Sequence, residues 1–551
     1  MTSNEESGCP KLPWMVEFHS TLDGKILNYQ FDAAYADDHI EHLCRLNVDS
    51  LLPTWRLCGI MCSIGPSCND PEVLLNMMKA GMTMAYIKMA HTTLDGVKDT
   101  LKNIKIAQNR YCKAQKRAVS IGIGIEIKGP EIRTGIIEDP DVKDIELKEG
   151  DEISLTTDPM YEQFVSKDMI YVNYDKLTQV VEPGDKILIS DSENGSVTLS
   201  AIEIVGSIIR CLIENAGTIA NNASVSLEAA IDLPLLSEED EEVLQFAAKE
   251  RISYIFIPYA ERADILTQVR NTLGDNGKAT MIISKIENLA GIYNIDELIP
   301  ASDGVLVSRC ALGREIPFEK MILVQKMIVG KCNKNGLPVI IAPHMLQSMV
   351  KQPTPTNAEL SDITSCIADG VDAFALTKET AIGPYPVESV DKLNVICRHA
   401  EPLVYQKQLF GDLTKTVSPI EPIYAIAIAA VEASLKVNAA GIVVTSVTGR
   451  SAKLISRFRP RCPIITVTRH GHVARFLNLW RGVFPIQYIK RYDEDWCKDI
   501  ERRVQYGLTY GKLAGYVRTG DAVVLITGSR TGAGFTNSLK IVYASEYDCP
   551  N

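Results

Sequence analysis

The chain has 551 residues, of which 46% are hydrophobic and 23% charged, a composition typical of a globular protein with several well-filled domains. Its net charge of −12, without any long run of Lys or Arg, argues against a nucleic-acid partner. The 14 cysteines form no Cys-x-x-Cys pair, no apolar run could span a bilayer, and the start MTSNEESGCP does not resemble a signal peptide. We therefore expect a soluble cytoplasmic protein with reduced thiols and no membrane partner.

The first part of the chain changes from a polar extension to alternating strands and helices. Residues 1–44 form the extension, with an amphipathic helix around 36–46, and we expect it to fray or to pack on a neighbouring subunit. Apolar runs then predict strands over 57–63, 84–89 and 119–126, and helical periodicity predicts helices over 70–80 and 94–116.

The alternation stops between residues 130 and 231. Short strands and turns take its place, with strands predicted over 152–156, 170–174, 186–190, 197–204 and 208–214. Helical pattern is scarce here, which indicates an inserted all-β module.

After residue 232 the alternation resumes. Strands are predicted over 254–258, 280–283, 304–307, 338–342 and 373–376, and helices over 238–249, 263–273, 319–335 and 358–368. Three strands before the insertion and five after it make eight, the number in a (β/α)8 barrel. The predicted fold is therefore α/β, with a barrel built from residues 45–129 and 232–404 and interrupted by the β module of residues 130–231.

Residues 405–551 predict a separate, smaller α/β domain. Its expected strands are 441–445, 464–467 and 522–526, and its expected helices are 423–435, 451–458 and 472–479. This pattern is typical of a doubly wound sheet.

Two charged residues follow the apolar run over 280–283. Lys285 and Glu287 come directly after it, and residues at the carboxyl ends of parallel strands line the active sites of such folds. A cation and an anion on one rim suit a phosphate group and a divalent metal ion.

Several longer motifs carry a family resemblance. They are Ser63–Ser67 (SIGPS), Lys128–Gly135 (KGPEIRTG), Ile283–Asn288 (ISKIEN), Glu379–Ala381 followed by Gly383 and Tyr385-Pro386, and Gly449–Ser451 (GRS). Over essentially its whole length the chain resembles pyruvate kinases. The resemblance implies a barrel A domain, an inserted β-barrel lid or B domain, a C-terminal effector domain and a homotetramer. It also implies a glycolytic transferase that moves the phosphoryl group of phosphoenolpyruvate to ADP, giving pyruvate and ATP, with Mg²⁺ and K⁺ as cofactors.

Some functional positions of the family are kept. The resemblance implies that Lys285 stabilises charge at the transferring phosphate and that Glu287 is one of two carboxylate ligands of Mg²⁺. It also implies that Arg133 binds phosphate and that His91 lies near the nucleotide.

Other positions of the family are changed. The second metal carboxylate is replaced by Ala311, next to Cys310, and neither a methyl group nor a soft thiol suits Mg²⁺. The threonine that delivers the proton is replaced by Pro343, which has no hydroxyl. The neighbouring His344 could deliver the proton instead, or it is a structural histidine.

The K⁺ site and the phosphate site also depart from the family. Tyr86 stands in place of a phosphate-binding arginine, and Lys88 and Ala90 stand in place of an asparagine and a serine that ligate K⁺. The remaining two residues of that site are Glu126 and Ile127. The Lys88 ammonium could occupy the cation pocket, paired with Glu126 or Glu131.

The nucleotide side has lost lysines. Ile382 replaces one, and Ala220–Ser224 (ANNAS) has none where the family has a pair. One preorganised electrostatic group contributes about 2.7–4 kcal/mol to catalysis. Losing the metal ligand, the arginine and the proton relay together therefore slows turnover by roughly 10⁴–10⁶.

Three functions stay open at this point. The first is a pyruvate kinase with a degraded active site and weak or absent activity, and Mg²⁺ and K⁺ are both in doubt for it. The second is a non-catalytic regulatory subunit or metabolite sensor, as a homotetramer or in a hetero-oligomer with an active paralogue. The third is a different phosphate-ester chemistry at Lys285 and Glu287.

The C-terminal effector positions are better kept. The resemblance implies a sugar-bisphosphate site built from a phosphate loop, a Trp/Arg pair and a closing loop over 527–534, with the residues Ser446, Thr448, Gly449, Arg450, Ser451, Trp496, Arg503, Gly532 and Gly534. Hydroxyls and backbone N–H groups at the start of a helix suit a phosphate. Val447 replaces a polar family position and weakens that contact. Taken alone, the first loop could also be a Ser/Gly turn before a helix cap.

Overall fold

The computed structural model describes residues 21–22, 25–26, 30–115, 118–129, 132–139, 142, 144–191, 195–227, 236–415, 421–530 and 532–545. The chain divides into two compact units, one formed by Met1–Ile127 with Glu241–Asn551 and the other by Lys128–Asp240. The domain limits predicted from the sequence stay predictions, and each unit is described by itself.

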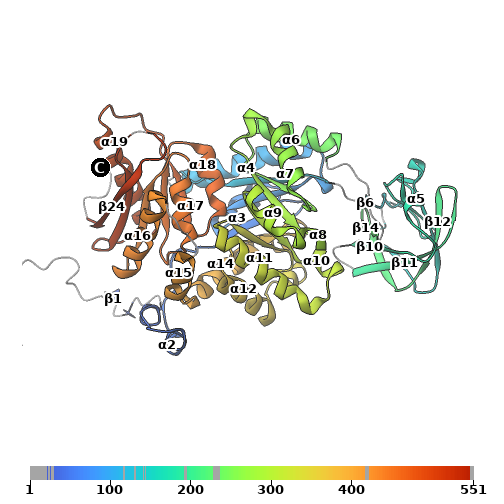
Figure 1. The fold of residues 1–551 in the computed structure, drawn as a ribbon, viewed down its shortest axis with the longest axis horizontal. Helices are drawn as coiled ribbons and strands as arrows, with labels where there is room; N and C mark the ends of the chain where they lie inside the picture. Colours follow the sequence, from blue (N-terminus) through green and yellow to red (C-terminus); the bar gives the residue numbers. More distant parts are fainter. Residues whose placement is uncertain are drawn as a thin grey trace, which may run out of the picture. The chain divides into compact units, whose positions relative to one another are not determined.

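Eight parallel strands of the larger unit close into a barrel (Figure 1). Around the barrel the strands are β15 (Tyr254–Ile257), β16 (Met281–Ile286), β17 (Gly304–Ser308), β18 (Val339–Ala342), β19 (Ala373–Leu376), β3 (Gly59–Ser63), β4 (Met84–Lys88) and β5 (Gly122–Glu126). β15 pairs with β5 in parallel, so the strands before and after the insertion join into one sheet. The predicted (β/α)8 barrel is confirmed.

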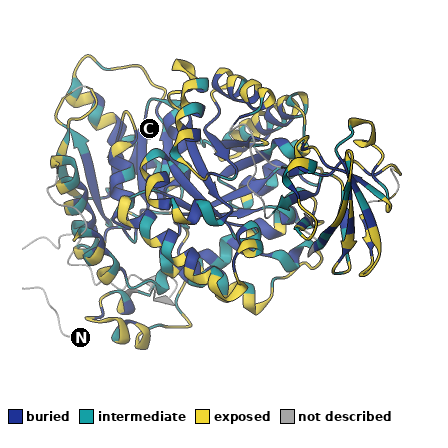
Figure 2. Cartoon of the chain, turned by 45° about the vertical axis from the view of Figure 1, so that its right-hand side comes forward, coloured by how far each residue is buried: buried dark blue, intermediate teal, exposed yellow. Residues whose placement is uncertain are grey.

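Helices follow the barrel strands, as the alternating pattern predicts. They include α3 (Pro71–Ala80), α4 (Leu94–Gln115), α6 (Glu238–Glu250), α7 (Ala263–Leu273), α9 (Ile295–Ala301), α11 (Met321–Asn335), α12 (Asn357–Asp369) and α14 (Pro386–Ala400). Helix α12 shows how local sequence sets the limits: Thr356 and Glu359 form a capping box at its start, and Gly370 ends it in a left-handed conformation. In Figure 2 the strands are buried and the helices expose their outer faces.

Aromatic side chains fill the interior of the barrel below the carboxyl ends of its strands. The ring of Tyr86 meets that of Phe256 edge to face at 4.8 Å between centroids, and Tyr254 lies at 6.4 Å from Phe256. Gly124 makes room for this packing, because a Cβ there would lie 2.5 Å from the Phe256 ring. The interior is therefore a packed core, and only its rim can hold a site.

The smaller unit is all β apart from short helical turns. Its seven-stranded sheet has the order β6 (Ile132–Arg133), β14 (Ser224–Leu227), β10 (Lys186–Asp191), β11 (Gly195–Val205), β12 (Ile208–Ile213), β8 (Glu152–Thr156) and β9 (Met169–Tyr171). A second ladder joins β13 (Gly217–Ala220) to β7 (Asp144–Leu147). The β module is confirmed, but the sequence pattern missed four short strands of this unit, β6, β7, β13 and β14.

The C-terminal domain is a five-stranded sheet with helices packed on it. The strand order is β22 (Val483–Gln487), β21 (Ile464–Thr468), β20 (Gly441–Thr445), β23 (Ala522–Gly528) and β24 (Thr536–Tyr543), parallel except for β24. Its helices are α16 (Pro422–Lys436), α17 (Arg450–Arg457), α18 (Gly471–Phe476) and α19 (Trp496–Leu513). The predicted α/β domain is confirmed, although β22 and β24 were missed.

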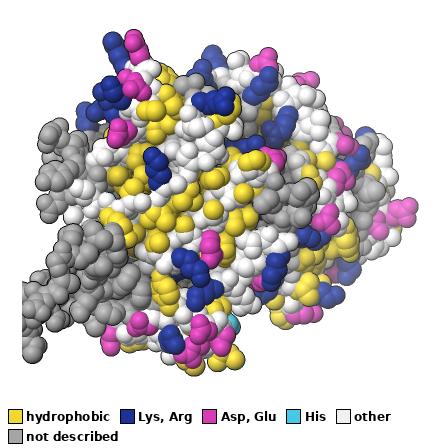
Figure 3. Space-filling model, turned by 60° about the vertical axis from the view of Figure 1, so that its left-hand side comes forward, with side chains coloured by type: hydrophobic (Ala, Val, Ile, Leu, Met, Phe, Trp, Pro, Cys, Tyr) yellow, Lys and Arg dark blue, Asp and Glu magenta, His cyan; other side chains and the backbone are white. Residues whose placement is uncertain are grey.

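This domain also presents apolar surface. Ile541 on the edge strand β24 is 43% exposed, and Leu513 at the end of α19 is 67% exposed. Figure 3, in which the C-terminal side comes forward, shows hydrophobic side chains gathered on one face.

The described part of the N-terminal extension packs on the chain itself. Helices α1 (Phe31–Ala34) and α2 (His39–Cys44) are held by the buried His42, whose ring nitrogens lie 2.7 Å from the Ala33 oxygen and 2.9 Å from the Leu403 oxygen. Tyr35 donates to the Leu435 oxygen at 3.2 Å. For these two helices the expectation that the extension frays is wrong, whereas its packing on a neighbouring subunit stays a prediction.

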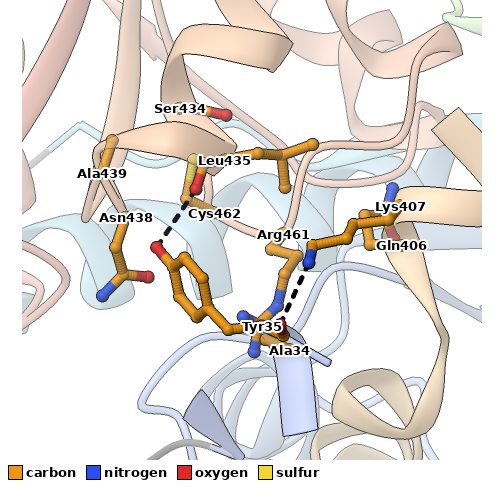
Figure 4. A pocket seen from close by; sticks show the side chains of 10 residues that line it. All are labelled: Ala34, Tyr35, Gln406, Lys407, Ser434, Leu435, Asn438, Ala439, Arg461 and Cys462. Carbon is orange, nitrogen blue, oxygen red and sulfur yellow. Dashed lines mark hydrogen bonds between the residues drawn. The ribbon is translucent and has the colours of Figure 1, made fainter. Parts of the chain in front are cut away.

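A small cavity of about 40 Å³ lies where α1 meets α16 (Figure 4). Tyr35, Lys407 and Arg461 are among its lining residues, and Lys407 donates to the Tyr35 oxygen at 3.1 Å. The cavity also borders the carboxyl end of α16, where helix carbonyl groups favour nearby cations. Lys407 and Arg461, the two cationic residues that line this cavity, therefore serve to dock the N-terminal helices.

Two properties of the described residues bear on the compositional expectations. None of the helices in the described part of the chain is long and apolar enough to cross a membrane. The cysteines within these residues are free thiols, most of them buried.

Candidate active site

At the carboxyl ends of the barrel strands, the side chains that face the barrel interior are polar. Met281 and Ile283 belong to the barrel core, and side chains alternate along a strand, so Lys285 faces the same interior two residues later. The same alternation after Tyr86 makes Lys88 face inward. Glu126 is the last residue of β5 and the register partner of Lys88. These three residues therefore lie on one rim, at the carboxyl ends of their strands.

Lys285 lies between two carboxylates. Its Nζ is 3.1 Å from Glu126 Oε2 and 3.2 Å from Glu287 Oε1, and all three residues are more than nine-tenths buried. Burial opposes the charged form, but the two carboxylates outweigh it and raise the pKa of Lys285, which stays protonated. Lys285 is also part of β16, which ends at Ile286, so the predicted end of this strand at Ile283 is wrong.

The Glu287 carboxylate accepts hydrogen bonds from protein groups besides Lys285. The Tyr259 N–H donates to its Oε2 at 3.2 Å, and the Ser308 hydroxyl also donates to this carboxylate. Burial favours the neutral form, yet Lys285 and these donors hold the pKa of Glu287 below its ordinary value. Tyr259 and Ser308 were missed by sequence reasoning. Their only signal is that each lies at or just after the end of a predicted strand.

Arg309 organises the neighbouring part of the rim. It pairs with Asp362 at 2.7 Å and donates to the carbonyl oxygens of Pro343 and His344, at 3.1 and 2.8 Å from its Nη2. It also begins the short helix α10 (Arg309–Glu315), on which Ala311 is half-buried. The structure thus brings the two replaced positions, Ala311 and Pro343, next to the same arginine.

His344 has a constrained backbone and a shifted titration. Its φ of 63° is in the left-handed region, which is uncommon for a residue with a Cβ. Burial, followed by the charges of Arg309 and Lys378, lowers the pKa of His344 below 6.5. The ring is therefore mainly neutral at pH 7. Its role as a proton donor stays a prediction.

The remaining predicted positions of the larger unit are placed as follows. Tyr86 is 2% exposed and belongs to the barrel core, while Lys88 Nζ lies 5.7 Å from the Tyr86 ring centroid. Ala90 and His91 form part of a 3₁₀ turn after β4, with His91 exposed. Ile382 is 50% exposed.

Lys378 was missed by sequence reasoning. It begins the short helix α13 (Lys378–Ala381) directly after β19, four residues before Ile382. Its only sequence signal is a basic residue immediately before the motif Glu379-Thr380-Ala381.

Arg133 belongs to the smaller unit. It lies on β6, and its Nη1 donates to the Asn222 oxygen at 2.8 Å. The possible Lys88 partner Glu131 lies outside the described residues.

The residues of the rim do not fit the metal ions that the family resemblance implies. Mg²⁺ requires oxygen ligands in near-octahedral array, but Glu287 is engaged by Lys285, Tyr259 and Ser308, and Ala311 supplies no oxygen. Within the described ranges, no three His, Cys, Asp or Glu side chains form a group that could hold a metal ion. K⁺ also needs oxygen ligands, and Lys88 and Ala90 have none in their side chains.

The phosphate loop of the C-terminal domain lies between β20 and α17. Gly449 has a φ of 81° and precedes the first residue of α17, and its N–H donates to Ser446 Oγ at 3.0 Å. The Arg450 N–H donates to Thr448 Oγ1 at 3.4 Å, and Arg450 pairs with Glu421 at 2.6 Å. The loop therefore presents hydroxyl groups, a cation and a helix start together.

The closing loop is connected to this phosphate loop. Ser451 Oγ lies 2.8 Å from Thr536 Oγ1, at the start of β24. The preceding Gly532 and Gly534 have φ values of 109° and 92°, which residues with side chains rarely adopt. The structure thus brings the two predicted loops to the same edge of the domain.

The predicted Trp/Arg pair is formed at α19. The Arg503 guanidinium lies 5.0 Å from the Trp496 ring centroid, and it pairs with the buried Asp499 at 3.0 Å. Arg469 pairs with the same carboxylate at 2.5 Å and stacks on Tyr492 at 3.8 Å.

Comparison with known proteins agrees with this architecture. Residues 55–390 match the family model of the pyruvate kinase barrel domain, and residues 424–542 match that of the pyruvate kinase alpha/beta domain. A human pyruvate kinase is 39% identical over 519 residues, which cover 94% of this chain and 90% of the relative. Pyruvate kinase 1 of Trypanosoma brucei brucei is 37% identical over 92% of this chain and 99% of its own length. The chain therefore belongs to the pyruvate kinase family.

Proposed function

We propose that the chain binds phosphoenolpyruvate at the barrel rim and transfers its phosphoryl group to ADP far more slowly than its relatives, if it transfers it at all. The observation that carries this proposal is the uneven rim. The buried Lys285 is held in place by Glu126 and Glu287, whereas Ala311 and Pro343 offer neither a carboxylate nor a hydroxyl group.

The retained groups support binding and positioning. The Lys285 ammonium stabilises negative charge on the transferring phosphate, and its two carboxylates fix its position. Protonation of the enolate needs a positioned donor, worth roughly 10²–10⁴ in rate. Pro343 has no proton to give, and the lowered pKa of His344 leaves little imidazolium at neutral pH.

A second candidate function is a non-catalytic regulatory subunit. It is favoured by the C-terminal domain, where the phosphate loop, the stacked Trp496–Arg503 pair and the linked closing loop are all formed. Under this proposal the ligand is a sugar bisphosphate. The edge strand β24, with its exposed Ile541, then contacts a second copy of the chain or an active relative in a cytoplasmic tetramer.

Steady-state turnover separates these functions. Purified protein is assayed with phosphoenolpyruvate, ADP, Mg²⁺ and K⁺, with and without fructose bisphosphate. The double variant Ala311→Asp/Pro343→Thr is assayed alongside. We expect very slow turnover in the natural sequence and faster turnover in the double variant, which regains a metal ligand and a hydroxyl.

The contrary results are distinct. Turnover of about 1 s⁻¹ or more in the natural sequence, within the usual enzyme range, contradicts the degraded-site proposal. No turnover in either protein, with thermal stabilisation by fructose bisphosphate, supports the regulatory subunit.

A further inference from the structure

The carboxylates of the barrel rim are bound to protein donors, which leaves a metal ion little to coordinate. Glu126 and Glu287 both face the Lys285 ammonium, at 3.1 and 3.2 Å, and Glu287 also accepts from Tyr259 and Ser308. A divalent ion bound at Glu287 would sit close to the Lys285 ammonium, which is 3.2 Å from this carboxylate, and like charges repel strongly where water is scarce. The site is therefore arranged around a fixed amine rather than around a metal ion.

The same rim carries further protein cations. Lys88 ends β4, Arg309 follows β17, and Lys378 follows β19, so all three lie at carboxyl ends of barrel strands together with Lys285. Together these residues place four positively charged side chains at the carboxyl ends of the barrel strands. Lysine and arginine are the usual protein partners of phosphate and carboxylate groups.

The positions of the two added lysines are informative. Lys88 stands where the family resemblance places a ligand of a bound K⁺ ion, and it is the register partner of Glu126. Lys378 lies in the same short helical turn that leads to Ile382, where the resemblance places a lysine. In both segments the chain itself supplies a positive charge near a position where the family has one.

We infer that the barrel rim binds a small anion carrying phosphate and carboxylate groups through Lys88, Lys285, Arg309 and Lys378, without a divalent metal ion. This inference rests on the proposed function, because phosphoenolpyruvate is its probe. It goes further in assigning the binding charge to the protein alone.

The first test measures the affinity for phosphoenolpyruvate by calorimetry, with excess EDTA and with excess Mg²⁺. The two dissociation constants should agree within about threefold, well under the tenfold that corresponds to about 1.4 kcal/mol. Electron paramagnetic resonance of Mn²⁺ should show no tight binding to the natural protein. The Ala311→Asp variant, which adds a carboxylate, should gain Mn²⁺ binding.

The second test removes the cations one at a time. Lys88→Met and Lys378→Met should each weaken phosphoenolpyruvate binding about tenfold or more in EDTA, because each removes a charge-assisted hydrogen bond to the anion. Lys98→Met is the matched control, since Lys98 is an exposed lysine on α4 that pairs with Asp95. Melting curves show whether each variant is folded, and Lys88→Gln or Lys378→Gln replaces the corresponding Met variant where it is not.

The possible results distinguish a failure of this inference from a failure of the proposed function. Phosphoenolpyruvate binding that requires Mg²⁺, or that both lysine variants leave unchanged, overturns the inference alone. Absence of phosphoenolpyruvate binding under every condition, in the Ala311→Asp variant as well, contradicts the inference and the proposed function together.

Discussion

The barrel rim and the C-terminal phosphate loop, the two sites for which we propose a phosphate ligand, arrange their charged groups in opposite ways. At the rim the charged groups are buried and paired with one another, as Lys285 is with Glu126 and Glu287. In the C-terminal loop Thr448 and Arg450 are exposed at the start of a helix. The two sites therefore differ in how far their charged groups are buried and in how they are paired within the protein.

The largest expected effect comes from breaking the buried rim pairs. Lys285→Met leaves two carboxylates facing each other in a buried site, and removing one partner of a buried ion pair costs about 3–5 kcal/mol of stability. Chemical denaturation at pH 7 should show this loss. The control Lys98→Met changes an exposed pair and should leave the free energy of unfolding unchanged within the error of the measurement.

Acid should partly rescue the Lys285→Met variant. Protonation of Glu126 or Glu287 removes the repulsion between the two carboxylates. The difference in free energy of unfolding between the variant and the natural protein should therefore become smaller as the pH falls from 7 to 5. A gap that does not change over this range would show that Lys285 contributes through packing and not through its charge.

The second prediction breaks the C-terminal loop. Gly449 has a φ of 81°, and an added Cβ would lie 3.2–3.3 Å from Leu477, Val473 and Phe476. Gly449→Ala should therefore cost about 1–3 kcal/mol in backbone strain. It should also abolish thermal stabilisation by fructose bisphosphate, while phosphoenolpyruvate binding at the rim is unchanged.

A second glycine provides the matched control. Gly411 lies inside helix α15 (Gln406–Thr414), its φ is not positive, and an added Cβ meets nothing within 4 Å. Gly411→Ala should stabilise the protein by roughly 0.5–1 kcal/mol through helix propensity. If Gly449→Ala behaves like this control, the loop does not depend on its left-handed glycine.

The two sites also differ in how far the sequence could predict them. The phosphate loop is one continuous segment, so Ser446, Gly449 and Ser451 could be assigned from a local motif. The rim is assembled from the ends of seven strands, and its polar contacts depend on register and side-chain direction. Tyr259 and Lys378 therefore remained unrecognised, and Lys285 was placed just beyond its strand.

The fold was predicted more completely than the site. Long buried strands such as β16 and β17 show continuous apolar runs, which make the barrel visible from the sequence. The edge strand β24 has a mixed burial pattern and gives no such signal. The docking of α1 and α2 depends on single contacts such as that of His42 with Leu403, which no local pattern encodes.

The smallest expected effect concerns the contact that joins the two regions. Lys453 lies on α17, one turn after Gly449, and its Nζ is 3.8 Å from the sulfur of Met281, the first residue of the strand that carries Lys285. The ammonium is 4.2 Å from the Trp480 ring centroid and 4.6 Å from that of Phe476. Burial, only partly offset by Asp303, lowers the pKa of Lys453 from 10.5 to about 8.

The sign of the pH effect follows from this lowered pKa. Between pH 8 and 10 the unfolded chain binds more protons at Lys453 than the folded chain, so stability from this residue rises with pH. The slope stays below the one-proton limit of about 1.36 kcal/mol per pH unit. Lys453→Met keeps the apolar stem and should remove the contribution of Lys453 to the slope of unfolding free energy against pH, whereas Lys98→Met should keep that contribution.

If Lys453→Met also weakens the response of phosphoenolpyruvate binding to fructose bisphosphate, then this contact couples the phosphate loop to the rim. If that response is unchanged, ligand binding at one site does not affect the free energy of binding at the other.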